Sequence, residues 1–315
     1  MRTIRFLLPL AMLALLSVGN ATTTRTARYS SAFATEKHSQ QSTEKAATSD
    51  SARIERLLSD LLPLRSKLSK EDMILKAARH FVGIPYVAHS LDRNSEETLV
   101  VNTREMDCTT YLETVIAVVL CIDRNHSRFS DFKRMLQSIR YRQGRLTYEN
   151  RLHYYQWWVT DNAQMGFVKE IVSPNPPFTA TQRLKINYMS ENHNAYDMLR
   201  NCPKRVAAIK RQEDQTNGTI VRYIPKSRLT NTALLRKVVR NGDIIAITTN
   251  KRNLDTTHLG FAVWHSDGLH LLNASSLKKN GSRVVEPKET LYQYLMQRPQ
   301  NPGIRVARLI LDNLC

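Results

Sequence analysis

Residues 107–120 read Asp-Cys-Thr-Thr-Tyr-Leu-Glu-Thr-Val-Ile-Ala-Val-Val-Leu and place a cysteine, Cys108, where an apolar helix begins. The first turn of a helix carries unpaired N–H groups and the positive end of the helix dipole, and both favour a thiolate. A cysteine can instead be a small buried apolar residue, but the polar neighbours of Cys108 do not fit that environment. We therefore predict a nucleophilic Cys108, activated as a thiolate, at the start of a helix over residues 108–123.

Asp107 directly precedes this cysteine. Its carboxylate can cap the free N–H groups of the helix start, which we expect to be its main role. A carboxylate beside a thiol also raises the pKa of the thiol, so Asp107 would act by positioning rather than by charge. Glu113 either serves the same helix start or faces solvent.

A predicted hairpin supplies the partners that a catalytic cysteine needs. Two β-rich runs, residues 257–264 and 269–276, flank the turn Asp267-Gly268. Such a hairpin brings His258 and Asn273 side by side. A cysteine nucleophile, a histidine that takes its proton and a polar group that orients the imidazole are the parts of thiol acyl transfer. If Asn273 is not the orienting group, His270 and Asp255 are the next candidates.

Five segments in this order resemble the NlpC-type cell-wall peptidases, and more narrowly their N-acetylmuramoyl-L-alanine amidase-like branch. They are Gly83-Ile84-Pro85-Tyr86-Val87, residues 107–114, Arg151-Leu152-His153-Tyr154 with Trp158 after it, His258-Leu259-Gly260, and Asn273-Ala274-Ser275-Ser276. The resemblance spans about residues 72 to 311. It implies an α+β, papain-like fold, in which the cysteine-bearing helix packs on a small antiparallel sheet and helical insertions are present.

The resemblance also implies roles for individual residues. Cys108, His258 and Asn273 take the catalytic positions, although the third position is commonly His in this superfamily. An asparagine can still accept a hydrogen bond from the imidazole, as in Cys-His-Asn sites. Tyr86 is either a donor to the reacting carbonyl and its oxyanion or a core aromatic residue with its hydroxyl at the rim.

The third segment is expected to contribute to the substrate cleft. Arg151, His153 and Tyr154 would supply a cation and hydrogen-bond donors that hold a carboxylate or lactyl group of a muropeptide. The neighbouring tryptophans, Trp157 and Trp158, are expected to pack internally, the alternative being a surface for sugar rings.

The resemblance implies a secreted or periplasmic cysteine amidase that hydrolyses the amide between N-acetylmuramic acid and L-alanine, with no cofactor. One alternative is an endopeptidase that cleaves the D-glutamyl–diamino acid bond with the same residues. Another is a catalytically silent wall-binding protein, because a fold does not guarantee chemistry. Intact sacculi and small soluble muropeptides remain equally open as substrates.

The chain divides into three parts. Residues 1–21 carry two arginines, an apolar run over residues 6–16 and small residues up to Ala21, which indicates a signal peptide rather than a retained anchor. Residues 22–52 have the composition of a flexible leader. Residues 53–315 are predicted to form a single domain with a mainly helical insertion at about 185–230. No later apolar stretch is long enough to anchor the mature chain in a membrane.

Within this domain, hydrophobic periodicity predicts helices over residues 71–82 and 129–140. Strands are predicted at residues 244–248 and at about 305–311.

The net charge of the chain limits its possible binding partners. The formal net charge is +18, and removal of residues 1–21 takes away two arginines and leaves +16. A positive charge of this size attracts nucleic acid, an anionic membrane surface or an acidic polymer such as peptidoglycan. The alternative is that the charged side chains only form a solvated surface. Export and the lack of a basic–aromatic motif exclude nucleic acid. The oligomeric state is not indicated.

The cysteines do not form a disulfide scaffold, because a nucleophilic Cys108 leaves only Cys121, Cys202 and Cys315. Cys121 ends the apolar run and is expected in the core. The sequence contains neither Cys-x-x-Cys nor His-Glu-x-x-His, so no metal site is predicted.

Overall fold

The computed structural model describes residues 50–230 and 233–314. The predicted signal peptide, the leader up to residue 49 and Cys315 lie outside the described residues. Residues 50–61 are helical, so residues 50–52, which we assigned to the leader, belong to a helix. Among the described helices, none is long and apolar enough to cross a membrane.

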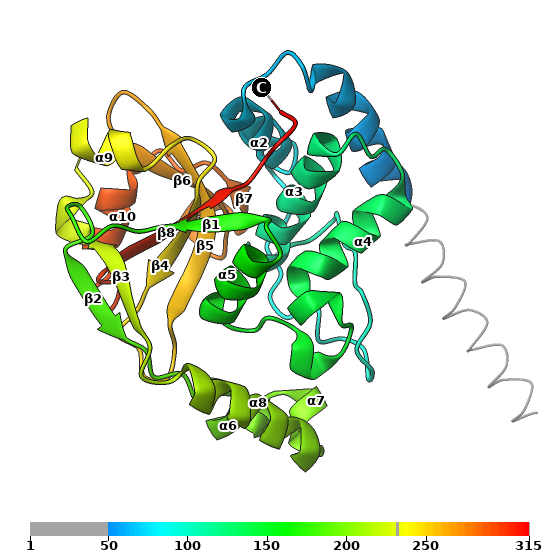
Figure 1. Ribbon diagram of the computed structural model, residues 1–315, viewed down its shortest axis with the longest axis vertical. Coiled ribbons are helices and arrows are strands. Elements are labelled where there is room, and N and C mark those ends of the chain that lie inside the picture. The colour runs from blue at the N-terminus through cyan, green and yellow to red at the C-terminus, as the bar shows by residue number, and fades with distance from the viewer. Residues whose placement is uncertain (1–49, 231–232, 315) are drawn as a thin grey trace, which may run out of the picture. The chain divides into compact units, whose positions relative to one another are not determined.

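Nine labelled helices and eight strands follow one another along the described chain (Figure 1). The helices are α2 (Lys70–Arg79), α3 (Cys108–Asp123), α4 (Phe129–Arg140), α5 (Tyr155–Gln164), α6 (Tyr188–Glu191), α7 (Asp197–Arg200), α8 (Pro203–Thr216), α9 (Ala233–Val238) and α10 (Leu291–Met296). The strands are β1 (Val168–Ile171), β2 (Ala180–Arg183), β3 (Ile220–Pro225), β4 (Ile244–Thr248), β5 (Thr256–Trp264), β6 (Leu269–Ser275), β7 (Arg283–Val285) and β8 (Gly303–Leu309).

Helix α3 is the central helix and has the bounds that the sequence predicts. Asp107 caps it: its Oδ1 accepts from the N–H of Thr110 at 2.8 Å, and the Thr110 hydroxyl accepts from the N–H of Asp107 at 2.9 Å. This reciprocal pair satisfies two N–H groups at the helix start. All residues from Thr110 to Asp123 are buried, as expected for a helix that is surrounded by other elements on every side.

Glu113 does not have either of the environments that we expected. It lies 1% exposed inside the protein and forms an ion pair with Arg140 of α4 at 2.6 Å. A buried carboxylate of this kind needs a charged partner, and only the packing of α4 against α3 supplies it.

The strands form one sheet in the order β2-β3-β8-β4-β5-β6-β7, with β1 also paired to β8, and every pair is antiparallel. Successive residues of β4 point to opposite faces, so Ile244 and Ala246 join one hydrophobic core and Ile245 and Ile247 join the other. Helices α2 to α5 contribute to the first core, and α9 and α10 to the second (Figure 1). The fold is therefore mixed α+β with an antiparallel sheet, as predicted.

The predicted hairpin is confirmed as β5 and β6, which turn at Asp267-Gly268, and the predicted strands are confirmed as β4 and β8. Strands β1, β2, β3 and β7 were not anticipated. They are three to six residues long and only partly buried, and β3 pairs with β8 across a long sequence separation. Such strands carry a weak periodic signal, because their pairing depends on distant partners.

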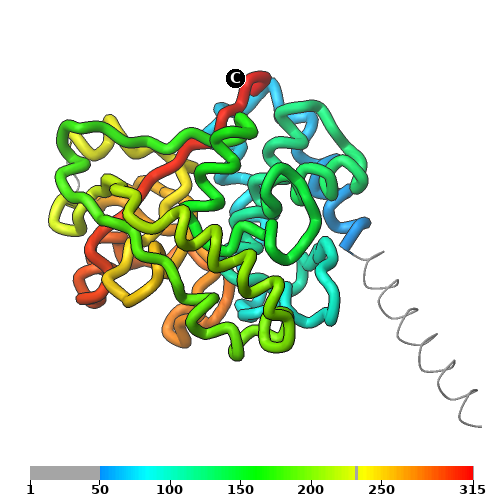
Figure 2. The backbone as a smooth tube through the Cα atoms, turned by 60° about the horizontal axis from the view of Figure 1, so that its bottom comes forward, coloured from blue at the N-terminus to red at the C-terminus, as the bar shows by residue number. Residues whose placement is uncertain are grey.

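Two further segments complete the domain. Within the expected insertion at 185–230, α6, α7 and α8 precede β3, which belongs to the main sheet. The C-terminal segment, red in Figures 1 and 2, leaves β8 and runs to the helices. There the N–H groups of Asn313 and Leu314 donate to Asp123, at the end of α3, at 2.9 and 3.1 Å.

Candidate active site

Cys108 is the first residue of α3 and is partly exposed between two adjacent cavities. One cavity, of about 220 Å³, is also lined by His258 and Leu259 of β5 and is called the histidine cavity. The other, of about 310 Å³, is also lined by Tyr86 and Asp107 and is called the tyrosine cavity. The backbone of Leu259 interacts with the thiol of Cys108 and lowers its pKa. The cysteine therefore lies beside the strand that carries the predicted base.

His258 and Asn273 meet on one face of the β5–β6 hairpin. Phe261 pairs with Leu272, and strand alternation then places His258 and Asn273 on the same face. The Nε2 atom of His258 lies 2.9 Å from Oδ1 of Asn273, whose Nδ2 donates to the carbonyl of Leu271 at 2.7 Å.

The orientation of this amide fixes the tautomer of His258. Because Nδ2 of Asn273 is held by the carbonyl of Leu271, Oδ1 is the atom that faces the imidazole. Oδ1 can only accept, so Nε2 of His258 carries the hydrogen. The other ring nitrogen, Nδ1, is then the basic one and is free to accept a proton.

The protonation states differ from our expectation of a thiolate. Burial, and after it the negative charge of Asp107, raise the pKa of Cys108 to about 12, against a smaller lowering by the backbones of Leu259 and Cys108 and the side chain of Thr109. Burial also lowers the pKa of His258, more than its bond to Asn273 raises it. At neutral pH the pair is therefore a thiol beside a neutral imidazole. The helix start alone does not outweigh desolvation and an adjacent carboxylate.

Tyr86 is half-buried and lines the tyrosine cavity together with Cys108. Its segment is held by backbone bonds, including one from the N–H of Tyr86 to the carbonyl of Ser282 at 2.8 Å. Burial, and then the nearby Cys108 and Asp107, raise the pKa of its hydroxyl to about 12. The hydroxyl therefore keeps its proton at neutral pH and is a hydrogen-bond donor.

Arg151 and His153 also line the tyrosine cavity, but both are engaged within the chain. The guanidinium of Arg151 is 6% exposed, forms ion pairs with Asp92 at 2.6 Å and Glu97 at 3.5 Å, and lies over the ring of Tyr148. A guanidinium with two internal carboxylates is not a free cation for a substrate. Burial lowers the pKa of His153 to about 3, and its Nε2 donates to the carbonyl of Tyr148 at 2.9 Å.

Tyr154 lines the histidine cavity, but its hydroxyl is bonded within the chain. Its hydroxyl donates to Glu213 of α8 at 2.6 Å and accepts from the N–H of Met189 in α6 at 3.0 Å. These bonds tie the start of α5, which Tyr154 directly precedes, to the insertion. The insertion in turn lines the histidine cavity with Tyr188, Met189 and Tyr196, a contribution that no sequence motif indicated.

The two reserve candidates for the orienting group have other partners. His270 is buried, and its ring nitrogens contact Asp267 at 2.9 Å and the carbonyl of Pro287 at 3.0 Å. Asp255 lines the histidine cavity, but its carboxylate accepts from the N–H groups of Gln156 and Thr256, each at 2.7 Å. Asn273 is thus the candidate that contacts His258.

The remaining predicted features concern packing and metals. Trp157 and Trp158 are both buried, as expected for internal tryptophans. Cys121 lies in the core, and Cys108, Cys121 and Cys202 are free thiols. Among the described residues, no cluster of His, Cys, Asp or Glu side chains has the arrangement of a metal site.

Comparison with known proteins places the chain in a family. The N-acetylmuramoyl-L-alanine amidase-like (AmiA-like) family model matches residues 76–304. Among solved structures, an N-acetylmuramoyl-L-alanine amidase from Bacteroides uniformis is 36% identical with a TM-score of 0.70, over 76% of this chain and 99% of that chain. A Bacteroides fragilis protein provisionally named a xylanase is 38% identical with a TM-score of 0.68, over 74% and 99%.

A protein from Legionella pneumophila is 23% identical with a TM-score of 0.65, over 85% of this chain and 96% of that chain, and supports the fold alone. Among curated proteins, none matches this chain. The family match includes Cys108, His258 and Asn273 and covers most of the described residues. The chain belongs to the N-acetylmuramoyl-L-alanine amidase-like family of peptidoglycan hydrolases.

Proposed function

We propose that the protein is a cysteine-dependent amidase that hydrolyses the bond between the lactyl group of N-acetylmuramic acid and L-alanine. The observation that carries the proposal is the bond between Asn273 and Nε2 of His258. This bond leaves the basic Nδ1 free in a cavity that Cys108 also lines. A nucleophile, a base and an orienting group on separate rigid elements are the parts of acyl transfer. The choice of this amide is supported by family membership.

The neutral thiol and imidazole require a coupled proton transfer. Nδ1 of His258 takes the thiol proton as the sulfur of Cys108 attacks the carbonyl carbon, and a tetrahedral oxyanion forms. The backbone N–H of Cys108 and the hydroxyl of Tyr86 donate to this oxyanion, and one such donor contributes about 3 kcal/mol. The imidazolium then gives its proton to the leaving nitrogen, and the carbon–nitrogen bond breaks to leave a thioester.

Hydrolysis of the thioester restores the enzyme. His258 takes a proton from a water molecule, and the resulting hydroxide attacks the thioester carbonyl. Collapse of the second tetrahedral intermediate breaks the carbon–sulfur bond, and Cys108 regains its proton from the imidazolium. The products are the carboxylic acid of N-acetylmuramic acid and a peptide with a free L-alanine amine.

The two cavities suggest how the substrate lies. His258 must reach the leaving nitrogen, so the histidine cavity takes the peptide half of the substrate. The tyrosine cavity, which Tyr86 lines, takes the muramyl half.

The NlpC-type, papain-like placement that the sequence suggested belongs to this proposal, as does export to the periplasm or exterior after cleavage near Ala21. The basic charge of the mature chain would favour an acidic wall polymer or its soluble muropeptides.

Glycoside hydrolysis, the activity after which one similar structure is named, fits this site poorly. Such hydrolysis uses a free pair of carboxylates. Four carboxylates line the two cavities, and each is held by a partner within the chain: Asp92 by Arg151, Asp107 by Thr110, Glu113 by Arg140, and Asp255 by two N–H groups.

Product masses test the proposal. The protein is incubated with N-acetylmuramoyl-L-alanyl-D-glutamyl-diamino acid and, separately, with intact sacculi, with Cys108→Ala as the control. The expected products from the soluble substrate are N-acetylmuramic acid and the intact tripeptide. Release of the diamino acid alone would support the endopeptidase instead. Binding without any Cys108-dependent product would support the silent wall-binding protein.

A further inference from the structure

The histidine cavity and the tyrosine cavity share a boundary at Cys108. The residues that line both are Cys108, Thr109, Leu152, His153 and Tyr196. Four of them belong to the start of α3 and to the segment before α5, whereas Tyr196 comes from the insertion, between a short 3-10 helix (His193–Ala195) and α7. A substrate that extends from one cavity into the other across Cys108 therefore passes close to Tyr196.

The hydroxyl of Tyr196 is available to a substrate. It makes no hydrogen bond within the part of the chain that the structure describes, and it is not closed off from solvent. The neighbouring groups are engaged: the hydroxyl of Tyr154 bonds to Glu213 and Met189, and Nε2 of His153 bonds within its own segment. The ring of Tyr196 is partly buried against the first core, so packing holds the ring and leaves the hydroxyl free.

Electrostatic interactions place this hydroxyl between the two cavities. Burial, and after it the nearby Tyr188, Asp92 and Glu213, raise the pKa of Tyr196 to about 12. Tyr188 lines the histidine cavity, and Asp92 lines the tyrosine cavity. The hydroxyl is therefore close to groups of both cavities, and it keeps its proton at neutral pH as a hydrogen-bond donor.

The backbone of Tyr196 is fixed by its neighbours. Its carbonyl accepts from the N–H groups of Leu199 and Arg200, each at 2.9 Å, and its N–H donates to the carbonyl of His193 at 3.1 Å. These bonds hold Tyr196 at the start of α7.

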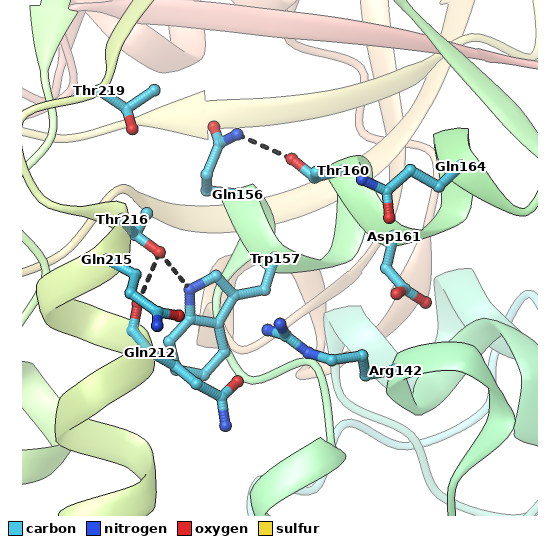
Figure 3. A pocket seen from close by; sticks show the side chains of 10 residues that line it. All are labelled: Arg142, Gln156, Trp157, Thr160, Asp161, Gln164, Gln212, Gln215, Thr216 and Thr219. Atoms are coloured by element: carbon cyan, nitrogen blue, oxygen red, sulfur yellow. Dashed lines mark hydrogen bonds between the residues drawn. The ribbon is translucent and has the colours of Figure 1, made fainter.

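The insertion that carries Tyr196 is in turn anchored on α5. The indole N–H of Trp157 in α5 donates to the hydroxyl of Thr216 in α8 at 2.8 Å (Figure 3). The side chain of Gln212, also in α8, donates to the carbonyl of Glu149 at 2.7 Å. A donor on an anchored segment needs little ordering when a substrate binds.

We propose that Tyr196 is a specificity residue whose hydroxyl donates a hydrogen bond to the carbonyl of L-alanine in the substrate. This inference rests on the proposed amidase reaction, in which Tyr86 and the N–H of Cys108 hold the carbonyl under attack. Elsewhere the insertion lines the histidine cavity alone, with Tyr188 and Met189, so Tyr196 approaches the peptide half. The first strong acceptor of that half is the L-alanine carbonyl. On the muramyl side, the nearest acceptor is an ether oxygen, which is weaker.

Two substrates that differ in one group test the inference. Both are amides of N-acetylmuramic acid. The amine half of the first is the ethyl ketone of L-alanine, and the second has a methylene group in place of the ketone carbonyl. Tyr196→Phe keeps the ring and its packing but lacks the donor. It should raise KM for the ketone about fivefold, the effect of one lost hydrogen bond, and leave kcat unchanged, because the bond is equally strong in the transition state. KM for the methylene substrate should not change.

Tyr223 in β3 provides a matched control, because its hydroxyl also makes no hydrogen bond with the described residues and it lines neither cavity. Tyr223→Phe should leave KM unchanged for both substrates. An unchanged KM of Tyr196→Phe for the ketone, or equal losses on the two substrates, would overturn the proposed contact. If the wild type cleaves only the tripeptide substrate, the two compounds are compared in the same way as competitive inhibitors. Lack of any wild-type cleavage at the muramyl amide would refute the amidase reaction and this inference together.

Discussion

The hydrogen bond between Asn273 and His258 gives the sharpest test of the proposed mechanism. Asn273 is 3% exposed, and its amide is locked by the carbonyl of Leu271, so its Oδ1 remains directed at Nε2 of His258. Asn273→Ala removes this acceptor and frees the ring to change its tautomer and orientation. In the step where His258 is positively charged, the lost hydrogen bond is charge-assisted and contributes about 1.5–3 kcal/mol. This loss corresponds to roughly a 10- to 150-fold lower turnover.

The assay is single-turnover cleavage of the soluble muropeptide, with the folded fraction determined by circular dichroism. Asn162 provides a matched control, because it is fully buried and its Nδ2 donates to the carbonyls of Ile139 and Trp158, but it does not contact His258. Asn162→Ala should lower the melting temperature and leave the turnover of the folded enzyme near that of the wild type. Asn273→His, which restores the residue type of similar enzymes, should retain most activity. Wild-type turnover of Asn273→Ala would refute the role of this residue.

The other predictions concern the cysteine, its base and the oxyanion. Cys108→Ala and His258→Ala should each be nearly inactive, and the double variant should be no worse than either, because the two act as a unit; additive losses in turnover would contradict this. Iodoacetamide should abolish cleavage, whereas a chelator should not. Because burial raises the pKa of Cys108, the rate at which iodoacetamide alkylates this thiol should rise about tenfold per pH unit near neutrality. An alkylation rate that does not depend on pH would instead indicate a thiolate. Burial holds the pKa of His258 below 6.5. The value of kcat/KM should therefore fall as the pH drops through this pKa, because the protonated imidazole is no longer a base. A loss of kcat/KM on acidification that is centred above pH 6.5 would contradict the neutral imidazole. Tyr86→Phe should lower kcat about 100-fold with little change in KM if its hydroxyl stabilises the oxyanion, whereas a structural role alone would change the melting temperature instead.

The sequence by itself determined those features that depend on neighbours along the chain. The start of α3 at Cys108 follows from the capping pair of Asp107 and Thr110, which are three residues apart. The meeting of His258 and Asn273 follows from the Asp-Gly turn and strand alternation. Helix α4 was predicted with its observed bounds for the same reason: its hydrophobic period is local.

Only the tertiary structure decided the charges and walls of the site. Desolvation by surrounding elements reversed the expected state of Cys108, since burial outweighs the local effect of a helix start. Arg151 gained its carboxylate partners from residues 92 and 97, more than fifty positions earlier, so its charge is not available as the sequence suggested. The insertion completes the histidine cavity with Tyr188, Met189 and Tyr196. These features depend on packing between distant segments, and distant packing leaves no periodic signal in the sequence.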